Sequence, residues 1–249
     1  MKKYIPNILT CLNLLNGACA CIFAAWNMPM GSLAFLAIAF IFDCIDGLAA
    51  RKLDAVSPIG KELDSLADVV SFGLTPSIVL FAWCHDKFTG DISFLAFFPL
   101  LIVAASALRL AKFDIDQRQT ENFLGMPTPA NALMITSATA YATVPSVQGG
   151  ANGIALAMSV PWVVPTISLL LSILLVSELP FFSLKFKTWD FRSNMVRYIY
   201  LMIIALFAAI ALICKVSPIL VTFICFAFYL ILCLALCFFG SLSHKRKAA

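Results

Sequence analysis

Apolar runs follow one another along almost the whole chain, and each is about as long as a helix that crosses a bilayer. They lie at 8–27, 30–50, 62–84, 92–112, 130–147, 158–178, 196–214 and 217–240. Hydrophobic residues make up 62% of the chain and charged residues only 12%, whereas soluble domains contain about 25% charged residues. Backbone polar groups inside a bilayer must be satisfied within the segment, and these runs are too long for barrel strands. The sequence therefore predicts an all-α integral membrane protein with about eight transmembrane helices.

The positions of the basic residues predict how these helices are oriented. If the N-terminus lies inside, every Lys and Arg except Lys87 and Lys215 falls in an inner loop or tail. Cytoplasmic loops of membrane proteins carry such an excess of basic residues. We therefore expect a multi-pass protein of the cell inner membrane with an even number of spans and both termini in the cytoplasm. A count of six would merge the last two runs, which are too long for one span.

Four aspartates occur near the ends of the second and third apolar runs: Asp43, Asp46, Asp64 and Asp68. A carboxylate in or near a bilayer costs on the order of a few kcal/mol, so four of them need a functional reason. Spacings of three and four residues put each pair on one helical face, and the expected topology puts both pairs toward the cytoplasm. Carboxylate oxygens favour Mg²⁺, Mn²⁺ or Ca²⁺. Such ions at a membrane surface indicate chemistry on phosphate.

The residues around these aspartates fit a site for an anionic ligand. Gly47 lacks a side chain, so a ligand can approach the backbone closely, and Ala50 keeps the same face small. Arg51 offers a planar charged fork that suits phosphate. Gly60, one turn before Asp64, permits the two helix ends to approach each other.

Two other interpretations of the aspartates stay open. They could form salt bridges with the basic residues at the same helix ends, although four carboxylates exceed the three cations Arg51, Lys52 and Lys61. They could also line an ion path, since acidic residues in spans mark transporters. Against a transporter, all four lie at one end, and no later span carries a carboxylate deep within it.

The pattern Asp43-x2-Asp46-Gly47-x2-Ala50-Arg51-x8-Gly60-x3-Asp64-x3-Asp68 resembles the signature of the CDP-alcohol phosphatidyltransferases in every fixed position. Four further segments resemble the membrane-spanning bacterial phosphatidylserine synthases within that family. They are IPNILTCLNLLNG at 5–17, RLAKFDID at 109–116, FLGMPTPANA at 123–132 and VSELPFFSLKFK at 176–187. The resemblance implies a catalytic core of six helices over 1–190, with its metal and CDP motif at 43–68. Residues 191–249 would add two helices and a basic tail.

The resemblance also implies roles for individual residues. Asp43, Asp46 and Asp64 would hold two divalent cations, Mg²⁺ or Mn²⁺, and Asp68 would contribute to the metal site and accept a proton. Seven residues would contact CDP-diacylglycerol: Asn7, Thr10, Gly47, Ala50, Arg51, Ser57 and Gly60. Some of these also have ordinary structural interpretations, Ser57 as a loop residue and Asn7 and Thr10 as an interfacial turn and a helix cap.

The implied reaction transfers the phosphatidyl group from CDP-diacylglycerol to the hydroxyl of L-serine. Its products are phosphatidylserine and CMP. The implied partners are these two substrates, membrane lipids and a second copy of the chain, with no nucleic acid. The alternative is the same reaction with glycerol 3-phosphate or an inositol phosphate as acceptor, and a phosphate-bearing acceptor should need more cations in its pocket.

L-Serine carries a carboxylate, so its pocket should contain a cation. Arg109 and Lys112 end the fourth apolar run on the expected cytoplasmic side, and Lys185 lies in the next inner loop. Each could instead be a basic anchor at the membrane surface. Asn131, beside Pro129 in an otherwise apolar run, could reach the pocket or form a hydrogen bond between helices.

Overall fold

The structure is a computed structural model that describes residues 4–88, 90–115, 123–146, 150–181 and 195–247. Two long antiparallel helices begin the fold, and a third helical segment with a π-helical middle follows them. The N-terminal half comprises α1 (Ile5–Ala25), α2 (Pro29–Lys52), α3 (Pro58–Asp68), η2 (Val69–Leu74), α4 (Thr75–Lys87), η3 (Gly90–Leu100) and α5 (Leu101–Ile115). The C-terminal half comprises β1 (Phe123–Leu124), α6 (Thr128–Ala142), α7 (Gly153–Met158), α8 (Val163–Val176), β2 (Pro180–Phe181), α9 (Met195–Ile213) and α10 (Pro218–Lys247).

Five helical segments among the described residues are long and apolar enough to cross a membrane. They are Ile5–Ala25, Pro29–Lys52, Pro58–Lys87, Ile92–Phe113 and Pro218–Phe238. Two shorter apolar helices cover Val163–Val176 and Met202–Ala211. The prediction of a helical membrane protein is confirmed, with one pair of two-residue strands in addition. The number of eight spans and the cytoplasmic termini remain predictions.

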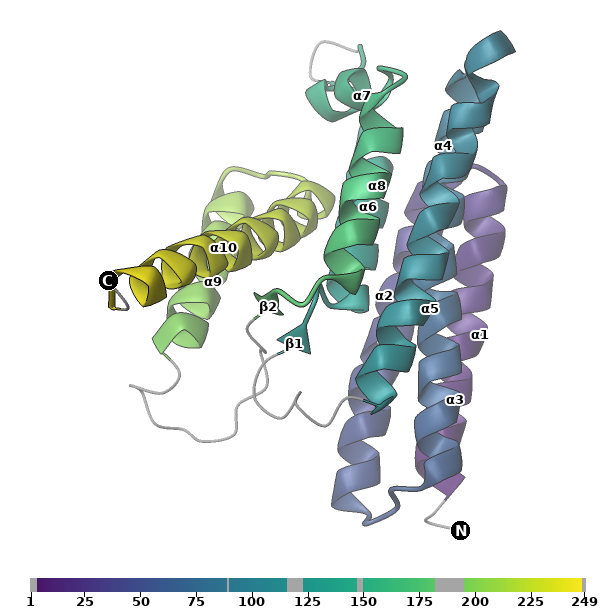
Figure 1. The fold of residues 1–249 in the computed structure, drawn as a ribbon. Coiled ribbons are helices and arrows are strands. Elements are labelled where there is room, and N and C mark those ends of the chain that lie inside the picture. The colour runs from purple at the N-terminus through teal and green to yellow at the C-terminus, as the bar shows by residue number, and fades with distance from the viewer. Residues whose placement is uncertain (1–3, 89, 116–122, 147–149, 182–194, 248–249) are drawn as a thin grey trace.

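The helices form an elongated bundle in which α1 to α5 lie side by side, with α6 and α8 along one flank (Figure 1). α10 packs against α6 and runs obliquely to the bundle, and α9 lies against α10. Nearly every residue of α6 is buried, because α10, α2 and α4 all pack against it. The centre of the C-terminal half is therefore a short helix that is enclosed by protein.

Local sequence accounts for the helix starts near the aspartates. α1, α2 and α3 each carry a proline in the first helical turn, where the missing N–H has no partner to lose. The Ser57 side chain accepts a hydrogen bond from the Gly60 backbone N–H at 3.0 Å and so caps α3. Because α3 begins only a few residues after α2 ends, the two aspartate pairs lie toward the same end of the bundle.

A π-helical segment interrupts the third long helix directly after Asp68. π-Bulges in helices occur frequently at functional sites. Ser71 lies in this segment and is fully buried against Gly17 of α1. A Cβ atom on Gly17 would come within 2.8 Å of the Ser71 Cα, so the glycine permits this close packing. The apolar pattern of the third run indicated a helix but did not reveal its π-helical part.

Strands β1 and β2 pair antiparallel, with Phe123 opposite Phe181. Gly125 follows β1 with φ +78°, and a Cβ atom there would lie 2.9 Å from the Ser177 carbonyl oxygen. Only glycine fits this conformation and this space. The pairing joins 123–132 and 176–187, which are two of the segments that carry the family resemblance.

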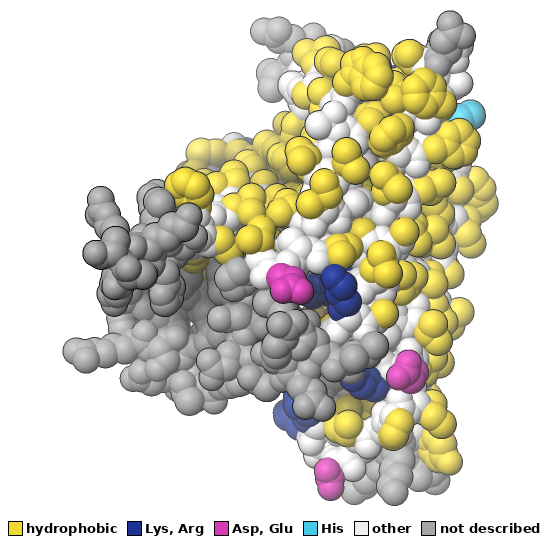
Figure 2. Space-filling model, viewed as in Figure 1, with side chains coloured by type: hydrophobic (Ala, Val, Ile, Leu, Met, Phe, Trp, Pro, Cys, Tyr) yellow, Lys and Arg dark blue, Asp and Glu magenta, His cyan; other side chains and the backbone are white. Residues whose placement is uncertain are grey.

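The surface of the bundle is largely apolar (Figure 2). On the face shown, the described charged side chains gather in the lower half, toward the N-terminus and the turn between α2 and α3. Large hydrophobic side chains are exposed along the helices, among them Ile8, Leu15 and Ile22 on α1 and Leu170 and Ile173 on α8. Such an apolar surface is what a surrounding bilayer would cover.

Candidate active site

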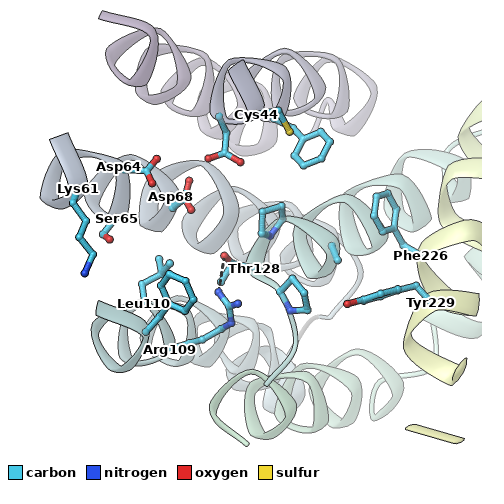
Figure 3. A pocket seen from close by; sticks show the side chains of 16 residues that line it. Cys44, Lys61, Asp64, Ser65, Asp68, Arg109, Leu110, Thr128, Phe226 and Tyr229 are labelled. Atoms are coloured by element: carbon cyan, nitrogen blue, oxygen red, sulfur yellow. Dashed lines mark hydrogen bonds between the residues drawn. The ribbon is translucent and has the colours of Figure 1, made fainter. Parts of the chain in front are cut away.

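Three of the four predicted aspartates converge, Asp43 from α2 and Asp64 and Asp68 from α3; Figure 3 labels Asp64 and Asp68 in the pocket that they line. One carboxylate oxygen from each of Asp43, Asp64 and Asp68 lies within 4.8 Å of the other two. Three carboxylates at this spacing repel one another unless cations lie among them, and hard oxygen ligands are the donors that Mg²⁺ and Mn²⁺ prefer. The residues present therefore fit a divalent-cation site.

Asp46 lies apart from this trio. It is 4% exposed, and its Oδ2 accepts a hydrogen bond from Thr10 Oγ1 at 2.7 Å. Asp43 and Asp46 are three residues apart, so they share one helical face but lie almost one turn apart along α2. The structure thus places Asp46 on the side of α2 that faces α1, next to the trio rather than within it.

A cavity of about 260 Å³ opens between the ends of α1, α2 and α3. Every residue predicted to contact CDP-diacylglycerol lines it: Asn7, Thr10, Gly47, Ala50, Arg51, Ser57 and Gly60. Asp46 and Asp64 line it as well. The fold has therefore gathered residues from three separate segments around one space, and we refer to it as the N-terminal cavity.

The glycines of the N-terminal cavity have distinct roles. A Cβ atom on Gly60 would lie 3.0 Å from both Asn7 Oδ1 and Ser57 Oγ, so this glycine permits α1 and α3 to approach. A Cβ atom on Gly47 would lie 3.6 Å from Arg51 Nη1 and near no other described group. The space beside Gly47 is therefore open toward the cavity, with the guanidinium of Arg51 next to it.

A second cavity, of about 410 Å³, lies on the other side of the aspartate trio. Its polar lining residues are Asp43, Lys61, Asp64, Ser65, Asp68, Arg109, Thr128 and Tyr229. Its apolar lining includes Phe40, Cys44, Leu110, Phe113, Pro127, Pro129, Ala130 and Phe226. Lys61 and Asp64 line both cavities. Two ligands can therefore meet at the aspartates from opposite sides, and we call this space the central cavity.

Arg109 brings a positive charge into the central cavity from α5. It is 7% exposed, and its Nη1 donates a hydrogen bond to Thr128 Oγ1 at 3.3 Å. The guanidinium lies within electrostatic range of Asp68 and Tyr229. Burying a guanidinium is costly unless opposite charges and hydrogen bonds compensate it, so its place beside the acidic trio indicates a functional site.

The other residues predicted for serine lie elsewhere. Lys112 is exposed and lines neither cavity. Asn131 is fully buried one residue beyond the lining segment of α6, and its Oδ1 and Nδ2 make no hydrogen bond to any described residue. Lys185 lies outside the described residues. Of the predicted serine ligands, the structure brings Arg109 to the aspartates.

Asn13 is a contact residue that sequence reasoning missed. Its Nδ2 donates to Asp68 Oδ1 at 3.4 Å, and its Oδ1 accepts from Ser71 Oγ at 2.8 Å. The Asp68 carboxylate orients the amide, because an ionised carboxylate only accepts hydrogen bonds and the NH₂ group must face it, which leaves the Asn13 Oδ1 to accept from the Ser71 hydroxyl. A signal was present in the sequence: Thr10 and Asn13 are polar residues three positions apart, hence on one face of a largely apolar helix.

Comparison with known proteins agrees with this geometry. The sequence profile described as CDP-alcohol phosphatidyltransferase matches residues 3–174, which is more than half of the chain. The chain belongs to the CDP-alcohol phosphatidyltransferase family. The match includes the four aspartates, both glycine positions and Arg109, and it ends within α8, so α9 and α10 lie outside the shared family region.

Several relatives carry the name CDP-diacylglycerol–serine O-phosphatidyltransferase. The Bacillus subtilis protein is 37% identical over 129 residues, covering 51% of this chain and 70% of the relative. The Mycobacterium tuberculosis protein is 36% identical over 138 residues, covering 53% of this chain and 47% of the relative. The Methanocaldococcus jannaschii protein is 34% identical over 131 residues, covering 53% of this chain and 58% of the relative. The chain thus spans about half the length of several curated relatives that it matches.

Proposed function

We propose that this member of the CDP-alcohol phosphatidyltransferase family is a CDP-diacylglycerol–serine O-phosphatidyltransferase. It would transfer the phosphatidyl group of CDP-diacylglycerol to the hydroxyl of L-serine and release CMP. The observation that carries the proposal is that two cavities meet at one carboxylate cluster. A two-substrate transfer needs such an arrangement, because the reacting atoms must come together while the rest of each substrate stays apart. The names of the relatives support serine as acceptor.

The N-terminal cavity would bind the CDP part of the lipid nucleotide. The guanidinium of Arg51 stands beside the open space at Gly47, where it would pair with phosphate oxygens as a planar fork. Asn7 and Ser57 border the same cavity and offer polar atoms to the nucleotide. The acyl chains would stay in the bilayer beside the apolar helix surfaces.

The aspartate trio would hold the divalent cations, with Asp46 as a further ligand on the nucleotide side. A divalent cation bound here neutralises the charge of the diphosphate and of the departing CMP. Thr10 holds Asp46 by a hydrogen bond, and Asn13 holds Asp68. These residues of α1 would keep the carboxylates in position for Mg²⁺ or Mn²⁺.

The central cavity would bind serine. The carboxylate of serine would pair with Arg109, and this pairing would direct the serine hydroxyl toward the aspartates. The hydroxyl oxygen then bonds to the lipid-side phosphorus, the bond from that phosphorus to the bridging oxygen breaks, and CMP leaves with the electron pair. Asp68 lines this cavity and would accept the hydroxyl proton as general base.

We also propose a topology for this site. Both termini and the two cavities would lie on the cytoplasmic side of the inner membrane, with about eight spans. The distribution of basic residues supports this orientation, as does the gathering of charged side chains toward one end of the bundle. Residues 1–190 would form the catalytic core and 191–249 the additional helices, and the family resemblance supports a homodimer.

The proposed activity can be tested by CMP release from purified protein in detergent with CDP-diacylglycerol and Mg²⁺ or Mn²⁺. L-Serine, glycerol 3-phosphate and an inositol phosphate would be offered separately. We expect CMP release with serine. A phosphate-bearing acceptor would bring further negative charge next to the aspartate trio, and the cations among the described lining residues of the central cavity are Arg109 and Lys61. CMP release with glycerol 3-phosphate alone would overturn the proposal.

Arg109→Lys is expected to raise the KM for serine about tenfold or more, because lysine keeps the charge but loses the planar fork. The KM for CDP-diacylglycerol should stay unchanged. Lys112→Ala is the matched control, since Lys112 lies on the same helix, is exposed and lines neither cavity. Equal serine KM values in wild type and Arg109→Lys would exclude Arg109 from serine binding.

Asn13→Ala is expected to lower kcat about tenfold, because Asp68 loses the hydrogen bond that orients its carboxylate. The KM for CDP-diacylglycerol should change little. Asn16→Ala is the control, because Asn16 Nδ2 donates to the Leu12 carbonyl of its own helix at 2.8 Å. Steady-state kinetics of both variants check the prediction, and a similar loss in both would show a general effect on α1 instead.

A further inference from the structure

The C-terminal helix α10 contributes two side chains to the central cavity. Phe226 and Tyr229 lie three residues apart, hence on one helical face, and both line the cavity that contains Asp43, Asp68 and Arg109. Tyr229 is 3% exposed. Because the family match ends at residue 174, this wall comes from outside the shared family region.

The ring of Tyr229 is held by aromatic neighbours from two other elements. It packs against Phe181 of β2 with a centroid distance of 6.2 Å and against Tyr200 of α9 with a distance of 5.7 Å. Phe181 is the strand partner of Phe123. The strand pair therefore supports the Tyr229 ring, and the chain that leaves β1 continues into Pro127–Ala130, which lines the same cavity.

The polar end of Tyr229 faces the interior of the cavity. Figure 3 shows its oxygen directed inward from the side of α10, while Arg109 extends from the opposite side. The two groups are within electrostatic range of each other. The hydroxyl both donates and accepts hydrogen bonds, so its contact with the Cys233 thiol leaves capacity for a ligand.

We propose that Tyr229 is a specificity-determining residue that recognises the head group of the acceptor together with Arg109. α10 closes the acceptor end of the cavity, Arg109 pairs with the carboxylate of the amino acid, and the Tyr229 hydroxyl bonds to its polar atoms from the facing wall. This inference rests on the proposed function, and it gives the last helix a part in choosing the acceptor.

The test is Tyr229→Phe, which removes one hydroxyl and keeps the ring. We expect the KM for serine to rise about fivefold to tenfold, as for the loss of one hydrogen bond. The KM for CDP-diacylglycerol and the kcat at saturating serine should stay within about twofold, below the loss of one such bond. Tyr200→Phe is the matched control. Tyr200 belongs to the same aromatic group, but its hydroxyl donates to the Cys225 carbonyl at 3.3 Å and it does not line the cavity.

Two outcomes would overturn the inference. One is a serine KM that is the same in Tyr229→Phe and Tyr200→Phe, and the other is an equal rise in the KM for CDP-diacylglycerol. Thermal melting in detergent checks that both variants are folded. Wild-type activity with each acceptor separates this test from the proposed function. If the wild type uses another acceptor, the proposed function fails, and the KM for that acceptor in Tyr229→Phe then tests Tyr229 itself.

Discussion

Asp68→Asn is expected to lower kcat about a thousandfold, within the range that general bases contribute. Asparagine has nearly the same shape but cannot accept the proton of the serine hydroxyl. Because Asn13 donates to Asp68 Oδ1, the amide oxygen of the variant can still accept that hydrogen bond and the local packing is kept. The loss should therefore appear in kcat, while CDP-diacylglycerol still binds. Single-turnover CMP release with saturating metal measures this directly.

Asp54→Asn is the matched control for this prediction. The substitution is chemically the same, but Asp54 lies in the turn after α2, where it is exposed and lines neither cavity. Its φ of +50° suits asparagine as well as aspartate. Wild-type rates are expected for this variant. Substantial turnover by folded Asp68→Asn would remove Asp68 from the role of base and leave it as a metal ligand alone.

Asp43→Asn should produce a loss of similar size by a different route. It removes one charge from the trio whose oxygens lie within 4.8 Å of one another, so metal affinity and nucleotide binding should fall together. A bound cation contributes several kcal/mol of charge stabilisation, and we expect turnover to drop about a thousandfold at ordinary Mg²⁺ concentrations. The separate readout is calorimetric titration with Mg²⁺ or Mn²⁺ alone and then with CDP.

Thermal stability distinguishes this variant further. A ligand that binds only the folded state raises the melting temperature, so Mg²⁺ should stabilise the wild type and Asp54→Asn but not Asp43→Asn. In chelator, Asp43→Asn should melt no lower than the wild type, since one of three mutually repelling charges is gone. A wild-type Mg²⁺ response in Asp43→Asn would contradict its assignment to the metal site.

Much of the site could be predicted because its signals are local. Spacings of three and four residues determine which side chains share a helical face, and the signature combines such spacings with small residues at Gly47 and Gly60. The predicted nucleotide contacts accordingly line one cavity. The apolar runs likewise indicated helices wherever the structure has its long ones.

Other parts depended on contacts between distant segments. Asn13 is 55 positions from Asp68 in the sequence, and no local pattern connects them. Asp46 lies apart from the other three aspartates because α1 packs against α2 and Thr10 of α1 donates a hydrogen bond to Asp46. The π-helical turn after Asp68 and the β1–β2 pair left no clear trace in the apolar pattern, since the former resembles any helix and the latter is two residues long.

The sequence by itself determined that this is a helical membrane protein with a carboxylate cluster and an adjoining phosphate site, because hydropathy and helical spacing act over a few turns of chain. Only the tertiary structure decided that two cavities meet at that cluster and which residues form the second one. That cavity combines α2, α3, α5, α6 and α10. Which of their side chains face it depends on how helices far apart in the sequence pack. Inside a bilayer this packing rests on van der Waals contacts and hydrogen bonds between helices, and these contacts join residues that no local pattern connects.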